Sequence, residues 1–299
     1  MKSDIAYDIN PDCDYDVDLL VTTQDASIDW LTVTAKDRGV REILYSEASR
    51  WFAHAKDEGF AQRPWRFKGY DGWSIRGLRW GDRKDSSIIM LSGIAAQMNY
   101  AACLAFAQNI TRIDLAVTVT LAEPRENVAR KAYDYLTLNG TAKCPNKRRY
   151  TYIENSQGGQ TFYVGSRTSD QYGRLYDKGR EEGEALGIPK GKIWRYEVEF
   201  KAYRAKRVGQ QVLAVAKNLE SHPNDEIAGT VYKWFLSRGV NPIIKLDKDV
   251  AFLTDVSLEV SDDETSLHWL STQVSPTVVR LCNNGKKDET LRALGLLAD

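Results

Sequence analysis

Apolar and polar residues alternate along several segments of the chain, and this period of two predicts β-strands. The strand patterns cover 27–35, 65–80, 86–93, 111–121, 148–155, 160–166, 174–181 and 194–201. Composition and boundary residues such as Gly59 and Pro124 predict helices. These helices cover 41–58, 94–109, 124–138, 204–220, 226–239, 264–274 and 277–297. The order favours an α+β fold, with a largely antiparallel sheet flanked by helices and a helical C-terminal region.

Charge is unevenly distributed along a chain whose formal net charge is zero. Residues 1–25 contain seven Asp against one Lys, which predicts an acidic flexible tail. Residues 112–208 contain nineteen Lys and Arg against twelve Asp and Glu. Such a basic middle is the electrostatic footprint that a phosphate backbone needs, because each neutralised phosphate releases counterions. A solvated charged surface has the same balance, so charge alone leaves both interpretations open.

The length of the apolar runs and the spacing of the cysteines limit the class of protein. No run approaches the ~18 apolar residues of a spanning helix, and the start lacks the apolar core of a secretory signal. The cysteines Cys13, Cys103, Cys144 and Cys282 lie far apart and form no CxxC pair. We therefore expect a cytoplasmic protein with reduced thiols, no zinc site and no membrane association.

Three of the predicted strands each place polar side chains on one face. The shared faces carry Arg112 and Asp114; Arg174, Tyr176 and Lys178; and Arg195, Glu197 and Glu199. If the three strands are neighbours with these faces aligned, the carboxylates converge beside Tyr176. A carboxylate in a strand rich in Val, Ile and Leu is costly to bury unless it is paired or binds a metal. A cluster of carboxylates suits Mg²⁺ or Mn²⁺.

Transfer of a DNA phosphate to a tyrosine hydroxyl is a reaction that uses such a set. A phenol with a pKa of about 10 is a weak nucleophile near neutral pH. A divalent ion can polarise the scissile phosphate, while Arg and Lys offset the charge of the transition state. Each residue taken singly also has an ordinary interpretation. A strand carboxylate is commonly ion-paired, and a strand tyrosine, in a chain with fifteen, commonly packs in the core.

Several segments resemble the trans-acting rolling-circle replication initiation proteins, the Rep_trans family of plasmids, phages and integrative elements, including related relaxases. These segments are IDWLTVT (28–34), LSGIAA (91–96), TRIDLAV (111–117), TFYVGSRTSDQYGRLYDKGRE (161–181), WRYEVEFK (194–201) and LHWLSTQVSPTVVRL (267–281). The stretch YVGSRTSD…RLYDKGRE followed by RYEVEFK is the most specific of them, and the resemblance extends over roughly 28–297.

The resemblance implies an initiator that binds a double-strand origin and nicks one DNA strand by metal-assisted tyrosine attack. A 5′-phosphotyrosine link then holds the DNA, and the free 3′ hydroxyl primes synthesis. It also implies a homodimer and a host helicase as partners. The expected domains are the tail at 1–25, a nicking and joining catalytic domain at 26–203, and a mostly helical DNA-recognition and C-terminal region at 204–299.

Individual residues take roles from the same resemblance. Asp114, Glu197 and Glu199 match its acidic positions and are the predicted Mg²⁺ or Mn²⁺ ligands. Tyr176, in the RLYDK motif, is the predicted nucleophile, with Tyr163 and Tyr172 as alternatives. Arg174 and Lys178 are the predicted catalytic cations. The predicted DNA-binding residues are Arg112, Arg167, Arg195, Arg204, Lys206 and Arg207.

Two departures from the family pattern bear on these predictions. Relatives often carry a second acid where this chain has Thr118, so a metal site here has one ligand fewer. The histidine pair of other rolling-circle nucleases is absent, since His54, His222 and His268 are far apart. Two other functions stay open: a relaxase that starts conjugative transfer of an integrative element, and a non-catalytic DNA-binding replication regulator.

Overall fold

A computed structural model describes residues 21–138, 150–156, 158–183, 187–217, 223–244, 270 and 274–293. Its strands are β1 (Val21–Ala35), β2 (Arg63–Phe67), β3 (Tyr70–Ile75), β4 (Leu78–Arg83), β5 (Ser86–Ser92), β6 (Asn109–Leu121), β7 (Tyr150–Glu154), β8 (Gln160–Val164), β9 (Gln171–Asp177) and β10 (Ile193–Lys201). They form one antiparallel sheet in the order β2-β3-β4-β5-β1-β6-β10-β9-β8-β7.

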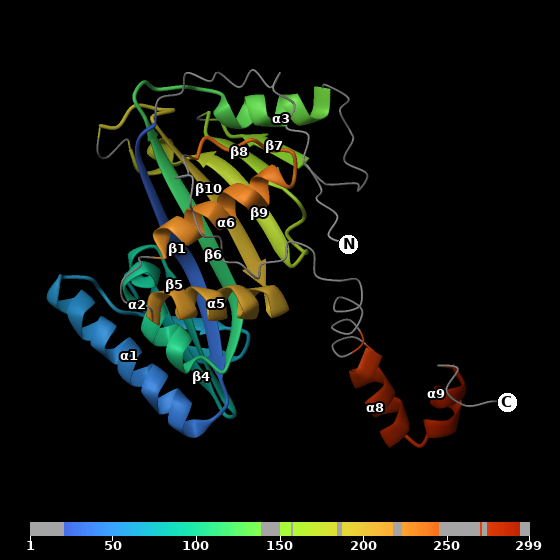
Figure 1. Cartoon of the computed structure of the whole chain (residues 1–299). Coiled ribbons are helices and arrows are strands. Elements are labelled where there is room, and N and C mark those ends of the chain that lie inside the picture. Colours follow the sequence, from blue (N-terminus) through green and yellow to red (C-terminus); the bar gives the residue numbers. More distant parts are fainter. Residues whose placement is uncertain are drawn as a thin grey trace. The chain divides into compact units, whose positions relative to one another are not determined.

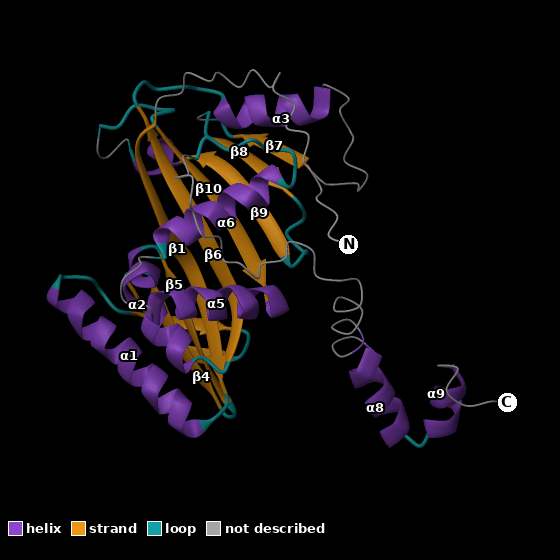
Figure 2. Ribbon diagram, in the orientation of Figure 1, coloured by secondary structure: helices purple, strands orange, loops and turns teal. Residues whose placement is uncertain are grey.

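The helices are α1 (Arg38–Asp57), α2 (Ile94–Phe106), α3 (Val128–Leu138), α4 (Lys178–Glu182), α5 (Ala202–Lys217), α6 (Asn224–Leu236), α8 (Ser275–Asn283) and α9 (Lys287–Ala293). Figure 1 shows α5 and α6 crossing the long central strands, and Figure 2 shows the sheet behind them. The predicted α+β fold, with an antiparallel sheet, flanking helices and helices near the C-terminus, is confirmed.

Strand β6 lies at the centre of the sheet between β1 and β10, and its two faces differ in chemistry. Ile113, Leu115 and Val117 are buried on the face that α5 and α6 cover. The other face carries Arg112 and Asp114, whose charged partners lie on β10 and β9. The period-two pattern therefore separates a helix-covered apolar face from a polar one.

Helix α6 packs closely on the apolar face because β9 has no side chain at Gly173. A Cβ at this position would lie 2.2 Å from Cζ3 and 2.6 Å from Cη2 of Trp234. Both Trp234 and the neighbouring Phe235 are fully buried, and Phe235 meets the Tyr196 ring of β10 edge to face at 5.3 Å. The glycine thus sets the distance between the helix and the sheet.

Gly173→Ala is expected to lower the free energy of unfolding by about 1–3 kcal/mol, because the new methyl group overlaps the Trp234 ring. Urea unfolding measures the loss. Gly39→Ala in α1 is the control, since its nearest contact would be 3.4 Å away, and it should be neutral or slightly stabilising. A loss that persists unchanged in a Trp234→Phe background, which lacks the clashing ring atoms, would contradict this packing explanation.

Some element boundaries differ from the sequence prediction. The strand predicted at 174–181 ends at Asp177, whose side chain accepts a hydrogen bond from the Arg180 backbone and so caps α4. The helix predicted at 124–138 begins at Val128, because the Arg125 backbone bonds instead with Gly191 and with the Trp194 indole. The helix predicted at 277–297 is interrupted at Gly285, whose φ of +79° ends the helical path.

The chain divides into two compact units, Met1–Leu253 and Thr254–Asp299. The first contains the sheet and the helices through α6, and the described part of the second contains α8 and α9. The predicted acidic tail, apart from 21–25 in β1, and most of the helix predicted at 264–274 lie outside the described residues. The functional division at 203 stays a prediction. Among the helices that are described, none has the length and apolarity needed to cross a membrane.

Candidate active site

The three strands predicted to share a polar face are neighbours in the sheet. In the register, Glu199 of β10 lies opposite Asp114 of β6, and Glu197 lies opposite Arg174 of β9. Arg195 lies between Thr118 and Tyr176 in the same way. We call this the polar face, made of Arg112, Asp114, Thr118, Tyr172, Arg174, Tyr176, Arg195, Glu197, Glu199 and Lys201.

Asp114 is the most deeply buried carboxylate of the polar face, with a side chain that is 0% exposed. Arg112 binds both of its oxygens, with Nε donating to Oδ1 at 2.8 Å and Nη2 donating to Oδ2. Burial raises the pKa of Asp114 well above its usual value; Arg112 opposes this shift, and Glu197 and Glu199 add to it. The Arg112 guanidinium also lies 4.6 Å from the centre of the Trp30 ring. Arg112 is therefore the main partner that offsets the negative charge of the buried Asp114 carboxylate.

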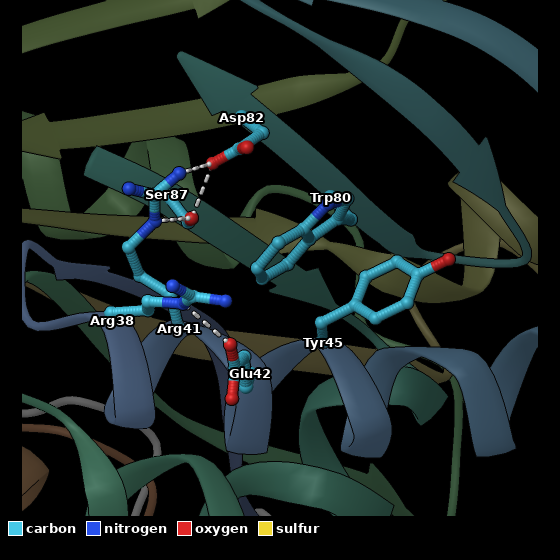
Figure 3. A pocket seen from close by; sticks show the side chains of 7 residues that line it. All are labelled: Arg38, Arg41, Glu42, Tyr45, Trp80, Asp82 and Ser87. Carbon is cyan, nitrogen blue, oxygen red and sulfur yellow. Dashed lines mark hydrogen bonds and ion pairs between the residues drawn. The ribbon is translucent and has the colours of Figure 1, made fainter. Parts of the chain in front are cut away.

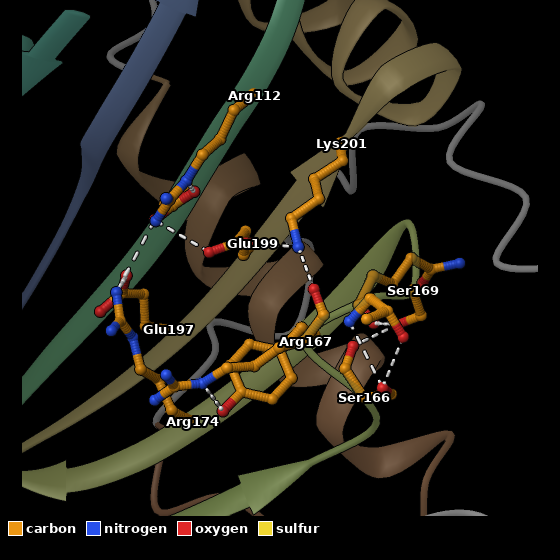
Figure 4. Close-up of polar contacts among 12 residues, drawn as sticks. Arg112, Ser166, Arg167, Ser169, Arg174, Glu197, Glu199 and Lys201 are labelled. Atoms are coloured by element: carbon orange, nitrogen blue, oxygen red, sulfur yellow. Dashed lines mark hydrogen bonds and ion pairs between the residues drawn. The ribbon is translucent and has the colours of Figure 1, made fainter. Parts of the chain in front are cut away.

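A chain of ion pairs and a hydrogen bond links Arg112, the partner of Asp114, to the loop between β8 and β9 (Figure 4). Arg112 Nη2 lies 2.8 Å from Glu199 Oε2, and Lys201 Nζ lies 2.6 Å from Glu199 Oε1. Lys201 Nζ also donates to the Arg167 carbonyl at 2.5 Å. The network holds the loop against the sheet through charge-assisted hydrogen bonds.

Tyr176 lies beside Glu197, the second buried carboxylate. Its hydroxyl donates to Glu197 Oε2 at 3.3 Å, and Glu197 Oε1 accepts from Arg174 Nη2. The cationic groups of Arg174 and Lys178 each lie 5.9 Å from the Tyr176 ring centre. Burial raises the pKa of Tyr176 above its usual range, and the charge of Glu197 adds to the shift. Tyr176 is therefore a neutral phenol with a carboxylate as hydrogen-bond acceptor.

Arg195 completes the surroundings of Tyr176. Its Nε donates to Thr118 Oγ1 at 2.9 Å, and its Nη1 donates to Asp29 Oδ1 at 2.8 Å. Asp29 sits where the register of β1 against β6 shifts between Ile28 and Trp30, and its pKa is raised by burial. Thr118 thus serves as a hydrogen-bond acceptor for Arg195.

The predicted metal ligands are paired with cations of the protein itself. Asp114 is bound by Arg112, Glu197 by Arg174, and Glu199 by Arg112 and Lys201. Within the part of the chain that the structure describes, no group of three or more His, Cys, Asp or Glu is placed to hold an ion. In this arrangement cationic side chains occupy the carboxylate oxygens that an ion would use, so binding of an ion here would require Arg112, Arg174 or Lys201 to move. The Mg²⁺ or Mn²⁺ site stays a prediction.

The two alternative nucleophiles lie together and away from the Glu197 hydrogen bond. The rings of Tyr163 and Tyr172 stack with centres 5.6 Å apart and planes at 18°. Arg167 lies 5.4 Å from the Tyr163 ring centre and donates to the Tyr172 hydroxyl at 3.3 Å. Among the hydrogen bonds of the described residues, Tyr176 is the candidate tyrosine whose hydroxyl donates to a carboxylate.

The predicted DNA-binding residues fall into two groups. Arg112, Arg167 and Arg195 belong to the polar face or its adjoining loop. The other three, Arg204, Lys206 and Arg207, lie on α5, which packs on the apolar face, so the fold does not bring them to Tyr176.

A separate pocket of about 400 Å³ lies between α1 and the strands β4 and β5 (Figure 3). Its charged groups neutralise one another, because Arg41 binds Asp82 at 2.6 Å and Arg38 binds Glu42 at 2.9 Å. It contains none of the residues predicted from the sequence, and we assign no role to it.

The prediction from sequence missed two polar-face partners, Asp29 and Lys201. For Asp29 the signal was the one used for Asp114, namely a carboxylate within an otherwise apolar strand, SIDWLTVTA. Lys201 follows Glu199 by two residues, so the same alternation in β10 would have placed it on the polar face.

Comparison with known proteins identifies the family. The chain is an α+β protein in which buried carboxylates, arginines and a tyrosine lie on one side of an antiparallel sheet. The sequence model of the replication initiation factor family (Rep_trans) matches residues 108–293, more than half of the chain. The chain belongs to this family, as the resemblance of its motifs predicted.

Solved structures and curated proteins were compared as well. The chain is similar to the structure of a rolling circle replication initiator protein from Geobacillus stearothermophilus, with 20% sequence identity and a TM-score of 0.45. The match covers 77% of this chain and 94% of that one. The search of curated proteins found no match.

Proposed function

We propose that this replication initiation factor acts in rolling-circle replication: it binds a double-strand origin and nicks one strand with Tyr176, forming a 5′-phosphotyrosine link. The observation that carries the proposal is the hydrogen bond from the Tyr176 hydroxyl to the buried Glu197, with Arg174 and Arg195 beside it. Family membership supports the biological role. A homodimer, a host helicase and a cytoplasmic location belong to the same proposal.

In the proposed reaction the Tyr176 oxygen attacks the scissile phosphorus. A new oxygen–phosphorus bond forms to Tyr176, and the bond from phosphorus to the 3′ oxygen breaks. Tyr176 gives up its proton toward Glu197 Oε2, its hydrogen-bond acceptor at 3.3 Å, and the departing 3′ oxygen takes a proton from water. Glu197 then returns its proton to solvent, so the step consumes no proton overall. The reaction conserves the number of phosphate esters, so the strand can be rejoined by the reverse attack.

The cations of the polar face have a second partner in this reaction. Arg174 and Arg195 are each paired with a carboxylate, and a DNA phosphate offers their guanidinium groups a competing acceptor. Contact with the phosphate would stabilise the additional negative charge of the transition state. Mg²⁺ or Mn²⁺ is part of the proposal as the predicted cofactor, and no step above is assigned to it.

The test is a nicking assay with purified protein and supercoiled DNA of the genetic element that encodes it. With Mg²⁺ or Mn²⁺ we expect open-circular DNA whose 5′ end carries the protein in a link that resists denaturant and yields to protease. Parallel reactions with chelator measure the metal requirement directly. Sequence-specific binding without an adduct under any of these ions would contradict nicking and leave the non-catalytic regulator.

A further inference from the structure

A cavity of about 410 Å³ opens on the polar face where β7, β8 and β9 meet their connecting loop. It is lined by Ile153 of β7, Tyr163 of β8, Tyr172 of β9, and Ser166, Arg167 and Thr168 of the loop. Ile153 is 50% exposed, an unusual state for a large apolar side chain, and Arg167 is also exposed. The cavity therefore combines apolar, aromatic, cationic and hydroxyl groups that solvent can reach.

The side chains that form the aromatic wall of this cavity are held in place by contacts with one another. Tyr172 is only 6% exposed and supports the half-buried Tyr163, which stacks on it nearly parallel. The Arg167 guanidinium lies over the Tyr163 ring and bonds the Tyr172 hydroxyl. A nucleobase stacks on such aromatic and guanidinium planes whatever its sequence, because every base has a π-face.

The loop that completes the cavity is fixed by hydrogen bonds. Ser166 and Thr168 join their hydroxyls at 2.9 Å, and the Ser169 backbone donates to the Ser166 carbonyl at 3.0 Å. Lys201 holds the loop at two points: its side chain donates to the Arg167 carbonyl (Figure 4), and its backbone N–H donates to the Asp170 carbonyl at 2.9 Å. A ligand would meet a preformed site and cost little ordering entropy.

The position of the cavity relates it to Tyr176. Tyr163 lies opposite Arg174 in the pairing of β8 with β9, and Tyr176 is two residues further along β9. Two residues of strand span ~7 Å. A DNA strand whose phosphate contacts Tyr176 would thus bring a nearby base to the cavity.

We infer that this cavity binds one unstacked base of single-stranded DNA close to the phosphate that Tyr176 attacks. Tyr163 and Tyr172 are then binding residues, which accounts for their stacking and for the engagement of the Tyr172 hydroxyl by Arg167. The inference rests on the proposed function, because nicking is what brings a single strand to this face.

The experiment compares binding of two fluorescent single-stranded probes, oligothymidylate and an abasic oligonucleotide of equal length. Wild-type protein should bind oligothymidylate about tenfold more tightly, the scale of one stacked base. Tyr163→Leu should remove most of that preference, whereas Tyr163→Phe should retain it. Tyr45→Leu is the control, since Tyr45 is exposed on α1, outside the polar face.

Neither probe requires cleavage, so the result is independent of the nicking assay. An unchanged preference in Tyr163→Leu, or an equal loss of affinity for both probes, would overturn the inference even if nicking is found. If Tyr163→Leu fails to fold, the exposed Arg167→Gln decides: it must weaken oligothymidylate binding more than abasic binding. Base-dependent binding without any adduct would support the cavity and contradict Tyr176 attack.

Discussion

Tyr176→Phe is expected to abolish the covalent DNA adduct and to lower the nicking rate to less than about one thousandth of the wild-type value, because the attacking oxygen is gone. Folding and DNA binding should change little. The ring remains in its half-buried place, and Glu197 keeps its ion pair with Arg174 when the hydroxyl is lost. Adducts of labelled DNA on denaturing gels and gel-shift titrations measure the two properties separately.

The matched controls for this prediction are Tyr163→Phe and Tyr172→Phe. Each removes one hydroxyl from the same face and leaves the stacked rings in place, so both should still form the adduct. Identification of the DNA-linked peptide by mass spectrometry assigns the residue directly. An adduct formed by Tyr176→Phe at the wild-type rate would transfer the role to another tyrosine.

The polar face could be predicted from local alternation because a strand of period two fixes which residues share a side. Arg112 and Asp114, or Glu197 and Glu199, follow from sequence spacing alone. Which strands are neighbours could not be derived in this way. The β6–β10 pairing joins segments about eighty residues apart, and its register depends on packing along the whole sheet.

Local signals failed where tertiary contacts decide the backbone. Lys178 has the spacing of a strand residue on the polar face, yet the Asp177 side chain caps a helix that starts at Lys178. Pro124 has the chemistry of a first helical turn, but the backbone of Arg125 is bound to β10 and its preceding loop. The bulge at Asp29 breaks the alternation of β1, so the period of two does not predict that its side chain reaches Arg195, although a carboxylate in an apolar strand indicates a need for a partner.

The pairing of carboxylates with arginines is the part of the site that residue types alone could not settle. Asp114, Glu197 and Glu199 suit a divalent ion as a set of oxygen ligands. The structure instead places Arg112, Arg174 and Lys201 against them. A cluster of acids on a strand face therefore predicts that compensation is needed, and the neighbouring strands determine which cations supply it.

Arg112→Met is expected to lower the free energy of unfolding by about 3–5 kcal/mol near neutral pH, because Asp114 is fully buried and would lose its two-point partner. Arg174 lies 3.8 Å from Asp114 and compensates only in part. Arg130→Met is the matched control. Arg130 also pairs with an aspartate, Asp134, but on the surface of α3, so its loss should be at most about 0.5 kcal/mol.

The destabilisation by Arg112→Met should depend on pH in a defined direction. Burial raises the pKa of Asp114 in the folded protein, so the folded state takes up a proton more readily than the unfolded chain. The contribution of the Asp114 carboxyl to stability is therefore fully present below its unfolded pKa of about 4, and it is lost as the pH rises through its folded pKa. Urea unfolding should show the largest deficit near pH 7 and a smaller one near pH 5.

The double variant Arg112→Met/Asp114→Leu should recover most of the stability, because it removes both charges together. A deficit no larger than that of Arg130→Met, or one that grows as the pH falls, would show that Asp114 does not depend on Arg112.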